Sequence, residues 1–527
     1  MTLWNLYFIL KLYLWASGHL TPLWAANLVF ALALAATSLV RARIWRLLRL
    51  LVGLAVAMPL MYREAAVPPF ARLVEELGAL SRFSLSYWLE LAQRFVPPML
   101  LLASLGAVLV YLVVNRWVRV STLVICMLIA VPVWQAGHAV LQHAGLSTAD
   151  SAFVAVATPR PAHTGSVAAD AATDHDAALA AFRSQEAQRE VRFGHVTSDR
   201  DAQFDIIVLH ICSLSWDDLD AVNARNHPML SHFDFLFTHF STAASYSGPA
   251  AIRVLRATCG QPAHAQLYKQ ASADCYLLSV LANAGFVPQT LLNHDGHFDD
   301  FASLVHINTG QPNVPLISNT DAPVAMHSFD GSAIRDDYAV LASWYARRAQ
   351  VQGPVALYYN TISLHDGNRL PGSNLKSRDS YPQRVNKLMS DFDRFADLVA
   401  NSGRRAVIVF VPEHGAALRA EPNQIEGMRE LPTPHIIHGP VGVRLVGFAN
   451  PHEPTTVVDA PASFLALAQL LANFVARSPF RPGVALSDYA TSLPRTQMVG
   501  ENEGTVTMVT AAGFSVKTPD GVWVDEQ

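Results

Sequence analysis

The stretch FDIIVLHICSLSWDDL, residues 204–219, decides how the larger part of this chain folds. Its first half is a run of apolar and β-branched side chains, typical of a strand buried on both faces of a parallel sheet. The run leads directly into Cys212, and a tryptophan and two aspartates follow. A lone cysteine at the end of a buried strand is ordinarily a core residue. The rest of the chain must show whether this one has another role.

Beyond this stretch, short apolar segments alternate with helical patterns. This order predicts an α/β fold in which helices cover both faces of a mostly parallel sheet. The tail, residues 505–524, contains Ala-Ala-Gly and Pro-Asp-Gly turns and predicts a small antiparallel β extension. The expected strands are residues 204–211, 233–239, 287–292, 355–359, 406–411 and 441–448, and the expected helices are residues 249–257, 276–284, 333–348, 384–401 and 462–475.

The composition indicates that only part of the chain lies in water. Of the 527 residues, 51% are hydrophobic and 15% are charged, whereas about 25% are charged in a typical soluble protein. The apolar excess lies almost entirely before His138. The net charge is −4 and no long basic run occurs, which speaks against nucleic-acid binding. We therefore expect a membrane region followed by a large domain outside the membrane.

Five apolar stretches precede residue 140, and we expect each to cross the membrane as a helix. A spanning helix needs about 20 mostly apolar residues. Lys11 interrupts the first stretch, and we expect its ammonium group to reach the membrane interface. A cleaved signal peptide is a weaker interpretation, because further apolar stretches follow directly. The five stretches are residues 3–15, 22–40, 47–62, 98–114 and 120–134.

Basic residues in the short connections predict the orientation. Positive charge marks the cytoplasmic side, so the N-terminus lies inside and five crossings place the later residues in the periplasm. Residues 64–96 are amphipathic and would lie along the outer surface. The arginines are Arg41, Arg43, Arg46 and Arg49 in one connection and Arg116 and Arg119 in another. We thus expect an anchor at residues 1–140, a linker at 141–203 that is partly helical around 177–192, and a large outer domain at 204–527.

Three of the four cysteines, Cys212, Cys259 and Cys275, lie in the outer domain, and Cys126 lies in the fifth apolar stretch. Three cysteines allow at most one disulfide there. Cys259 and Cys275 are close in sequence, and a disulfide between them would contribute about 3 kcal/mol to stability. If they pair, Cys212 stands alone.

Residues with metal-binding and nucleophilic chemistry stand where the expected strands end. Cys212 ends the first strand, His365 follows the fourth, and Glu413 and His414 follow the fifth. Ser247 precedes Gly-Pro and a helical run, so it would lie at a helix N-terminus, where phosphate groups bind. The carboxyl ends of strands in an α/β sheet form one edge, where we expect these residues to meet. Thiolate, carboxylate and imidazole are the side chains that bind Zn²⁺, and a metal would activate a serine hydroxyl as a nucleophile.

Each of these residues also has an ordinary structural interpretation. A Glu-His pair often lies on the protein surface or caps a helix. Ser-Gly-Pro commonly forms a turn, and His365 beside Asp366 can cap a loop. A second His- and Asp-rich loop, NHDGHFDDF, has the composition of a metal site. Such Gly-containing loops are usually solvated, so we expect no metal there. Its candidate ligands are His294, Asp295, His297, Asp299 and Asp300.

Five motifs together resemble a known family: ICSLSWDDL, SYSGPAAIRVLRATCGQ, LHDGN, VPEHGAAL and GMRELPTP. They are similar to the phosphoethanolamine transferase subunit of bacterial cellulose-secretion systems, a membrane-anchored member of the alkaline phosphatase superfamily. The resemblance covers residue 204 to about residue 500. It implies a zinc enzyme that moves phosphoethanolamine from phosphatidylethanolamine to glucose 6-hydroxyls of cellulose. Because the anchor is larger than tethering requires, we also expect it to contact subunits of the cellulose synthase complex.

The resemblance also implies a role for each matching residue. Ser247 would be the nucleophile that carries phosphoethanolamine covalently. One zinc ion would be held by Cys212, Ser247, Glu413 and His414, the site would be lined by Tyr246, His365 and Arg429, and Cys259 and Cys275 would form a disulfide. The related lipid A transferases have a threonine nucleophile and an acidic ligand in place of Cys212, so the cysteine and serine favour the cellulose branch.

Two other classes of function remain open. One is a different enzyme of the same superfamily, such as a lipid A or other glycan phosphoethanolamine transferase or a phosphodiesterase. A sulfatase is disfavoured, because Ser247 is followed by Gly-Pro-Ala-Ala and not by the x-P-x-R pattern of sulfatases. The other is a non-catalytic scaffold of a synthase complex, against which the intact set of Ser, Cys, Glu and His argues.

Overall fold

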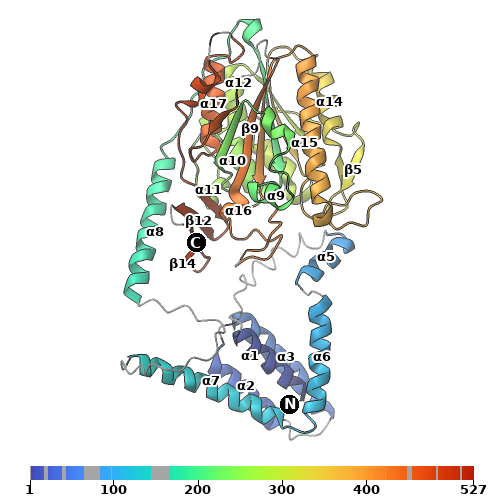
Figure 1. Ribbon diagram of the computed structural model, residues 1–527, viewed down its shortest axis with the longest axis vertical. Coiled ribbons are helices and arrows are strands. Elements are labelled where there is room, and N and C mark those ends of the chain that lie inside the picture. Colours follow the sequence, from blue (N-terminus) through green and yellow to red (C-terminus); the bar gives the residue numbers. More distant parts are fainter. Residues whose placement is uncertain are drawn as a thin grey trace. The chain divides into compact units, whose positions relative to one another are not determined.

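The computed structural model describes residues 2–16, 20, 22–37, 43–64, 83–95, 98–143, 165–421, 423–447, 454–481, 483, 485–510 and 513–526. The chain divides into two compact units, residues 1–161 and 162–527, and each is described by itself (Figure 1). Some predictions lie outside the described residues. These are the predictions for Arg41, for most of the amphipathic segment, for the linker between 147 and 164, and for residue 448.

The first unit is helical at each of the five predicted apolar stretches. Rings and aliphatic side chains such as Phe8, Phe30 and Tyr111 pack between these helices. Among the described residues, no helix combines the length and the apolar character needed to cross a membrane, so the spans stay a prediction. The helices are α1 (Thr2–Ala16), α2 (Trp24–Thr37), α3 (Arg43–Glu64), α6 (Pro98–Val114) and α7 (Val120–His143), with α5 (Leu85–Phe95) between the third and fourth.

Lys11 does not reach outward as the sequence predicted. It is 4% exposed, its Nζ donates to Oδ1 of Asn27 over 2.5 Å, and it forms an ion pair with Glu64. A buried ammonium group is stable only when it is paired and hydrogen-bonded. The partner carboxylate lies at the end of α3, far along the chain, which is why inspection of the first stretch alone could not reveal it.

The second unit is built on a mixed sheet of eight strands among the described residues, in the order β10-β2-β9-β8-β1-β7-β3-β4. Neighbouring strands are parallel except that β9 is antiparallel to both β2 and β8. The α/β class is therefore confirmed. The strands are β1 (Asp205–Cys212), β2 (Phe235–Ser241), β3 (Val287–Leu292), β4 (Leu316–Ile317), β7 (Val355–Thr361), β8 (Ala406–His414), β9 (His438–Val446) and β10 (Thr456–Val458).

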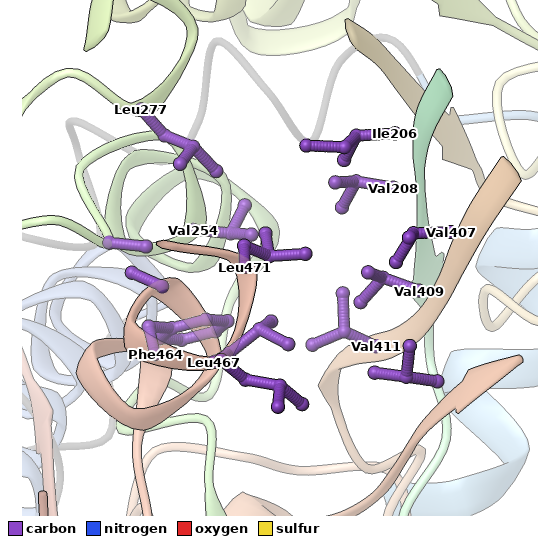
Figure 2. Packing of buried hydrophobic residues seen from close by; sticks show 14 of the residues in the cluster. Ile206, Val208, Val254, Leu277, Val407, Val409, Val411, Phe464, Leu467 and Leu471 are labelled. Atoms are coloured by element: carbon purple, nitrogen blue, oxygen red, sulfur yellow. The ribbon is translucent and has the colours of Figure 1, made fainter. Parts of the chain in front are cut away.

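Helices cover both faces of this sheet (Figure 1). Successive side chains of a strand point to opposite faces, so Ile206 and Val208 of β1 contact one layer and Ile207 and Leu209 contact the other. Figure 2 shows the first layer, in which β1 and β8 face α17, α10 and α12. That layer contains α10 (Ser247–Leu255), α12 (Leu277–Ala284), α13 (Phe301–Asn308) and α17 (Phe464–Ala476), and the second contains α9 (Trp216–Ala221), α14 (Asp337–Arg348) and α15 (Ser377–Asn401).

Two predicted helices begin elsewhere. Residues predicted as the start of the helix 333–348 form β6 (Ala333–Arg335), which pairs with β5 (Val324–His327). The helix α14 begins after Asp336, whose side chain caps it by accepting from the Ala339 amide. The helix α15 begins at Ser377 rather than residue 384 and continues through Pro382.

The tail forms the predicted antiparallel extension. Helix α8 (Gly165–Glu186), within the predicted linker, packs Leu179 and Phe182 against this sheet. Arg183 also pairs with Glu501 over 3.2 Å. The extension contains β11 (Val499–Asn502), β12 (Thr505–Thr510), β13 (Gly513–Lys517) and β14 (Trp523–Glu526).

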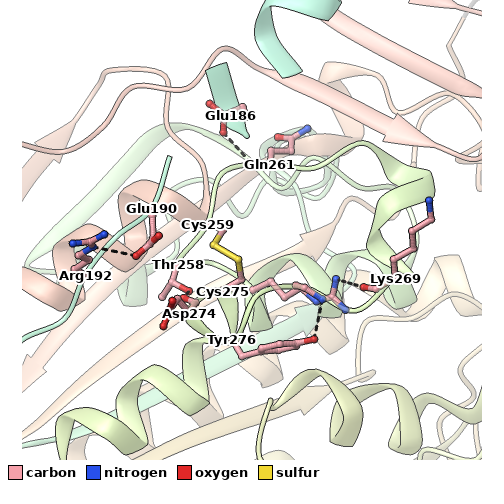
Figure 3. Close-up of a disulfide and its surroundings, with 12 residues drawn as sticks. Glu186, Glu190, Arg192, Thr258, Cys259, Gln261, Lys269, Asp274, Cys275 and Tyr276 are labelled. Carbon is pink, nitrogen blue, oxygen red and sulfur yellow. Dashed lines mark hydrogen bonds and ion pairs between the residues drawn. A yellow bond between two sulfur atoms is a disulfide. The ribbon is translucent and has the colours of Figure 1, made fainter. Parts of the chain in front are cut away.

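The predicted disulfide between Cys259 and Cys275 is present (Figure 3). It joins the chain just after α10 to the residues just before α12. Beside it, the Thr258 hydroxyl donates to the Asp274 carbonyl over 2.7 Å. The C-terminal end of α10 is thus tied to the same layer of helices that covers the sheet.

Candidate active site

The site begins with an irregularity between two neighbouring strands. Cys212 is the last residue of β1, and Glu413 and His414 are the last two of β8. The register pairs Ile211 with Pro412 but Cys212 with His414, so Glu413 is an extra residue on β8. In a regular strand, consecutive side chains point to opposite faces, whereas an extra residue re-aims them. Glu413 and His414 can therefore both turn toward Cys212.

These three side chains form a buried cluster. Cys212 and Glu413 are 0% exposed and His414 is 1% exposed. One ligand atom from each lies within 4.8 Å of the others. The Nε2 of His414 is 3.8 Å from the Cys212 sulfur and 3.7 Å from Oε2 of Glu413. Sulfur, carboxylate oxygen and imidazole nitrogen are the donor atoms of protein zinc sites.

Burial is the main influence on the ionisation of the three side chains in the cluster. Burial raises the pKa of the Cys212 thiol, and the nearby Glu413 carboxylate raises it further. Burial raises the pKa of Glu413 to about 7 and lowers the pKa of His414 well below its ordinary value. Desolvation thus opposes every charge here, and a bound cation would stabilise the thiolate and the carboxylate.

Two hydrogen bonds leave the correct lone pairs free for a metal. The carbonyl of Gly415 can only accept, so Nδ1 of His414 donates to it over 2.9 Å and Nε2 keeps its lone pair. Asn360 donates to Oε1 of Glu413 over 2.5 Å. The second carboxylate oxygen, Oε2, is buried without a hydrogen-bond partner in the described part of the chain. An unpaired buried carboxylate oxygen is costly, and coordination of a metal ion would satisfy it.

Ser247 lies against this cluster, in contact with Cys212. Its Oγ lies 3.3 Å from the Cys212 sulfur. It is the first residue of α10, and Tyr246 in the N-cap position makes no side-chain capping bond. Free backbone N–H groups and the positive end of the helix dipole therefore lie beside the serine, as a phosphate site requires.

Arg429 adds a positive charge beside Ser213 and Tyr246, the residues that follow Cys212 and precede Ser247 in the sequence. Its side chain is buried, and its Nη1 donates to Oγ of Ser213 over 3.3 Å. The guanidinium carbon lies 5.4 Å from the ring centroid of Tyr246, and the Tyr246 hydroxyl donates to Glu430 over 2.8 Å. The Nε of Arg429 has no hydrogen-bond partner within the described residues. A guanidinium with spare donors suits two oxygens of one phosphoryl group.

His365 lies in the loop after β7. A backbone hydrogen bond links this loop to the end of β1. The Leu364 amide donates to the Cys212 carbonyl over 3.1 Å. The Nδ1 of His365 donates to the Asp366 carbonyl over 2.6 Å, and its ring packs on Phe329 at a centroid distance of 5.0 Å. Burial, and secondly the charge of Arg429, lowers the pKa of His365 to about 4. Its ring is therefore neutral at pH 7, with a lone pair on Nε2.

Two residues that hold these loops, Asp218 and Arg384, were not predicted from the sequence. The Asp218 carboxylate accepts from the Ala416 amide over 2.7 Å, and burial raises the pKa of Asp218 to about 6. The buried Arg384 guanidinium donates to the carbonyl of His365 over 3.2 Å. The spacing of Ser215 and Asp218 is a capping-box signal that could have been found. Arg384 gave no signal, because an arginine in an amphipathic helix is ordinarily exposed.

The residues of the NHDGHFDDF loop do not join the cluster. The Nδ1 of His297 lies 2.8 Å from Oδ1 of Asp295, and both side chains are exposed. His294 is buried and lies 3.1 Å from Asn360. Within the described residues, the three metal-binding side chains that come together are Cys212, Glu413 and His414.

Comparison with known families shows which family the chain belongs to. Residues 160–523 match the C-terminal domain of cellulose biosynthesis protein BcsG, and residues 4–133 match its N-terminal domain. The chain belongs to the BcsG family. BcsG of Salmonella typhimurium is 34% identical over 538 residues, covering 99% of this chain and 95% of the relative. BcsG of Escherichia coli K12 is 34% identical over 543 residues with the same coverage. The predicted family is confirmed.

Solved structures show a looser similarity to this BcsG family member. An alkaline phosphatase superfamily protein from Vibrio parahaemolyticus is 14% identical with a TM-score of 0.45, covering 64% of this chain and 80% of that chain. The soluble domain of lipooligosaccharide phosphoethanolamine transferase A from Neisseria meningitidis is 12% identical with a TM-score of 0.40, covering 55% and 93%. A zinc complex of the C-terminal periplasmic domain of EptC from Escherichia coli is 12% identical with a TM-score of 0.41, covering 61% and 95%.

Proposed function

We propose that the chain is a zinc-dependent phosphoethanolamine transferase with an alkaline-phosphatase-like catalytic unit. The donor is phosphatidylethanolamine and the acceptor is the 6-hydroxyl of glucose units in cellulose. The observation that carries the proposal is the placement of Ser247 Oγ, at the N-terminus of α10, 3.3 Å from the sulfur of the Cys212, Glu413 and His414 cluster. Membership of a family named for cellulose biosynthesis supports the acceptor.

The first half of the reaction loads the serine. The Oγ of Ser247 attacks the phosphorus of the donor, a new Oγ–P bond forms, and the P–O bond to diacylglycerol breaks. The proton lost by Ser247 leaves on the diacylglycerol hydroxyl. Arg429 holds the phosphoryl oxygens, and the backbone N–H groups at the start of α10 bind the charge that develops on them.

The second half transfers the group to the sugar. A glucose 6-hydroxyl attacks the same phosphorus, the Oγ–P bond breaks, and the hydroxyl proton returns to Ser247. His365 is the residue to carry these protons, because its neutral ring has a free lone pair on Nε2. Tyr246 positions Arg429 by packing against its guanidinium.

One zinc ion fits the donor atoms of this cluster. Cys212, Glu413 and His414 would hold it together with Ser247. When bound, it supplies Lewis-acid chemistry that lowers the pKa of the serine hydroxyl and neutralises phosphoryl charge.

We further propose that residues 1–140 anchor the chain in the bacterial inner membrane, with the N-terminus in the cytoplasm and the second unit in the periplasm. Large apolar side chains face outward from the helices of the first unit, as a lipid environment favours. Examples are Val29 at 66%, Met58 at 71%, Leu102 at 70% and Val133 at 65% exposure. The Cys259–Cys275 disulfide suits the oxidising periplasm. An anchor of this size would also contact subunits of the cellulose synthase complex.

Intact-mass spectrometry of the full-length chain tests the mechanism. The zinc-loaded protein is incubated with vesicles containing phosphatidylethanolamine, beside Ser247→Ala and the exposed control Ser231→Ala. We expect a phosphoethanolamine adduct that maps to Ser247, present in wild type and in the control and absent from Ser247→Ala. Addition of cello-oligosaccharide should then remove the adduct and label the sugar.

Other results would favour the alternatives. Release of diacylglycerol and free phosphoethanolamine without an adduct would indicate a phosphodiesterase. Transfer to lipid A and not to cello-oligosaccharide would indicate a different glycan acceptor. If the zinc-loaded protein shows no adduct and no turnover, that result would favour a non-catalytic scaffold.

A further inference from the structure

One oxygen of the Glu413 carboxylate accepts the first of a chain of hydrogen bonds that ends in the NHDGHFDDF loop. The Nδ2 of Asn360, near the end of β7, donates to Oε1 of Glu413 over 2.5 Å. The Oδ1 of the same amide lies 3.1 Å from Nε2 of His294, which follows β3. Asn360 and Glu413 are both 0% exposed, and His294 is 8% exposed. The ends of β8 and β7 and the residues that follow β3 therefore meet in one buried line of polar groups.

The groups at the ends of this line fix the direction of every hydrogen bond. The Gly296 amide can only donate, and it lies 3.2 Å from Nδ1 of His294. Burial lowers the pKa of His294 to about 4, so the ring is neutral at pH 7 and its single N–H is on Nε2. Nε2–H then donates to Oδ1 of Asn360. This leaves Nδ2 of Asn360 as the donor facing Glu413.

The outer end of the line is itself fixed to the sheet. Asn319 donates from Nδ2 to the Leu292 carbonyl over 2.9 Å and to the His294 carbonyl over 3.0 Å. The His294 ring also packs on Phe301 of α13, at a centroid distance of 5.6 Å. A ring pinned at its backbone, its face and both nitrogens has one orientation, which it imposes on the Asn360 amide.

We propose that Asn360 and His294 are positioning residues that hold Glu413 so that its unpaired Oε2 faces the cation shared with Cys212 and His414. The inference rests on the zinc site proposed above. It assigns a role to the histidine-rich loop in support of a metal ligand rather than as a second metal site. A carboxylate held at one oxygen presents the other in a fixed direction, whereas a free carboxylate rotates between binding modes.

Loss of a group that hydrogen-bonds a metal ligand lowers metal affinity by about 10- to 100-fold. We expect a loss in this range for Asn360→Leu, which keeps the shape of the side chain and removes both polar atoms. We expect about a tenfold loss for His294→Phe, which keeps the ring contact with Phe301 and removes Nε2–H. His294→Gln, whose amide N–H can replace Nε2–H, should restore most of the affinity.

The measurement is the affinity of the full-length chain for Zn²⁺, in competition with a chromophoric chelator. The absorption spectrum of the Co²⁺-loaded chain serves as a second readout, because it reports ligand geometry. The matched control is His297→Phe, in the same loop but exposed and bonded to Asp295. We expect unchanged affinity and an unchanged spectrum for this control.

The double variant Asn360→Leu/His294→Phe tests whether the two residues act in series. If His294 acts through Asn360, the double variant should bind zinc like Asn360→Leu alone. If the losses of zinc affinity in the two single variants are fully additive in the double variant, His294 acts independently of Asn360. That result would overturn the proposal that His294 acts through Asn360.

Two further results separate the inference from the zinc site on which it rests. If wild type and both single variants bind zinc with equal affinity, the positioning role of Asn360 and His294 is overturned, and the zinc site itself stands. Failure of wild type to bind either metal would overturn the zinc site and the inference with it. If Asn360→Leu does not fold, the comparison of His294→Phe with His297→Phe decides.

Discussion

The sulfur of Cys212 lies 3.3 Å from the hydroxyl oxygen of Ser247, although the two residues are 35 positions apart. The cysteine ends a strand and the serine begins a helix, so both stand on rigid elements. In the proposed mechanism, a nucleophilic Ser247 at this distance from a Cys212 metal ligand would share the same cation. That proposal would account for a cysteine at the end of a buried strand, so metal binding is the first property to measure.

Zinc affinity should rise steeply with pH. Burial holds the Cys212 thiol protonated without metal and raises the pKa of Glu413 to about 7, whereas His414 is already neutral. Zinc binding therefore displaces two protons below pH 7 and one above it. Affinity should increase about a hundredfold per pH unit below 7 and about tenfold per unit above it. Chelator competition between pH 5.5 and 8 measures these slopes.

The variant Cys212→Ala provides the control for this pH dependence. It removes one displaced proton, so the affinity should become nearly independent of pH above 7 as well as weaker. An unchanged slope in Cys212→Ala would show that the thiol is not the group that releases the proton.

Arg429→Lys should slow transfer without preventing zinc binding. A lysine keeps the charge but loses the planar fork that can hold two phosphoryl oxygens. Removing one such donor from a transition state costs about a hundredfold in rate. Transfer from labelled phosphatidylethanolamine measures the effect, with Arg419→Lys as control because Arg419 is an exposed partner of Asp217. Equal losses in both variants would exclude a specific role for Arg429.

Much of the fold could be predicted because buried parallel strands are nearly continuous apolar runs. The bounds of β3 are those expected from residues 287–292. The short strands β4 and β10 were missed, because two or three residues pair with the sheet through distant partners and carry little local pattern. The start of the predicted helix at 333 became β6 for the same reason, since its partner β5 is set by long-range pairing.

In the candidate site, too, some features follow from the local sequence and others depend on contacts between distant parts of the chain. That Cys212, Ser247, Glu413 and His414 meet could be predicted, because the ends of neighbouring strands share one edge of the sheet. That both Glu413 and His414 face Cys212 depends on the register shift in β8, which local sequence does not reveal. The supports Asn360 and Arg384 were missed because hydrogen-bond partners across a fold cannot be read from spacing.

Removal of the Cys259–Cys275 disulfide should destabilise the second unit. The bond closes a loop with a sequence separation of 16, and a loop of this size contributes about 3 kcal/mol to the free energy of unfolding. We expect a loss of this order for the double variant Cys259→Ser/Cys275→Ser in urea unfolding. Cys126→Ser, at an exposed free cysteine, should have no such effect. A reductant should lower the stability of wild type and leave the double variant unchanged.

The buried carboxyl of Asp337 should make the second unit lose stability as the pH rises from about 4 to about 6. It accepts from Tyr359 over 2.6 Å and from Ser363 over 2.5 Å, and burial raises its pKa to about 6, against about 3.9 in an unfolded chain. The folded state therefore binds more protons in this window, so the free energy of unfolding falls by up to about 3 kcal/mol as the proton leaves.

Asp337→Asn cannot titrate, and whatever its constant cost in hydrogen bonds, its stability relative to wild type should improve by up to about 3 kcal/mol between pH 4 and pH 7. Urea unfolding of the full-length chain across this range measures the difference, with Asp488→Asn as an exposed control. The comparison of slopes separates the charge from the lost hydrogen bonds, because only the charge depends on pH. Parallel curves for wild type and Asp337→Asn would show that Asp337 titrates alike in the folded and unfolded chains.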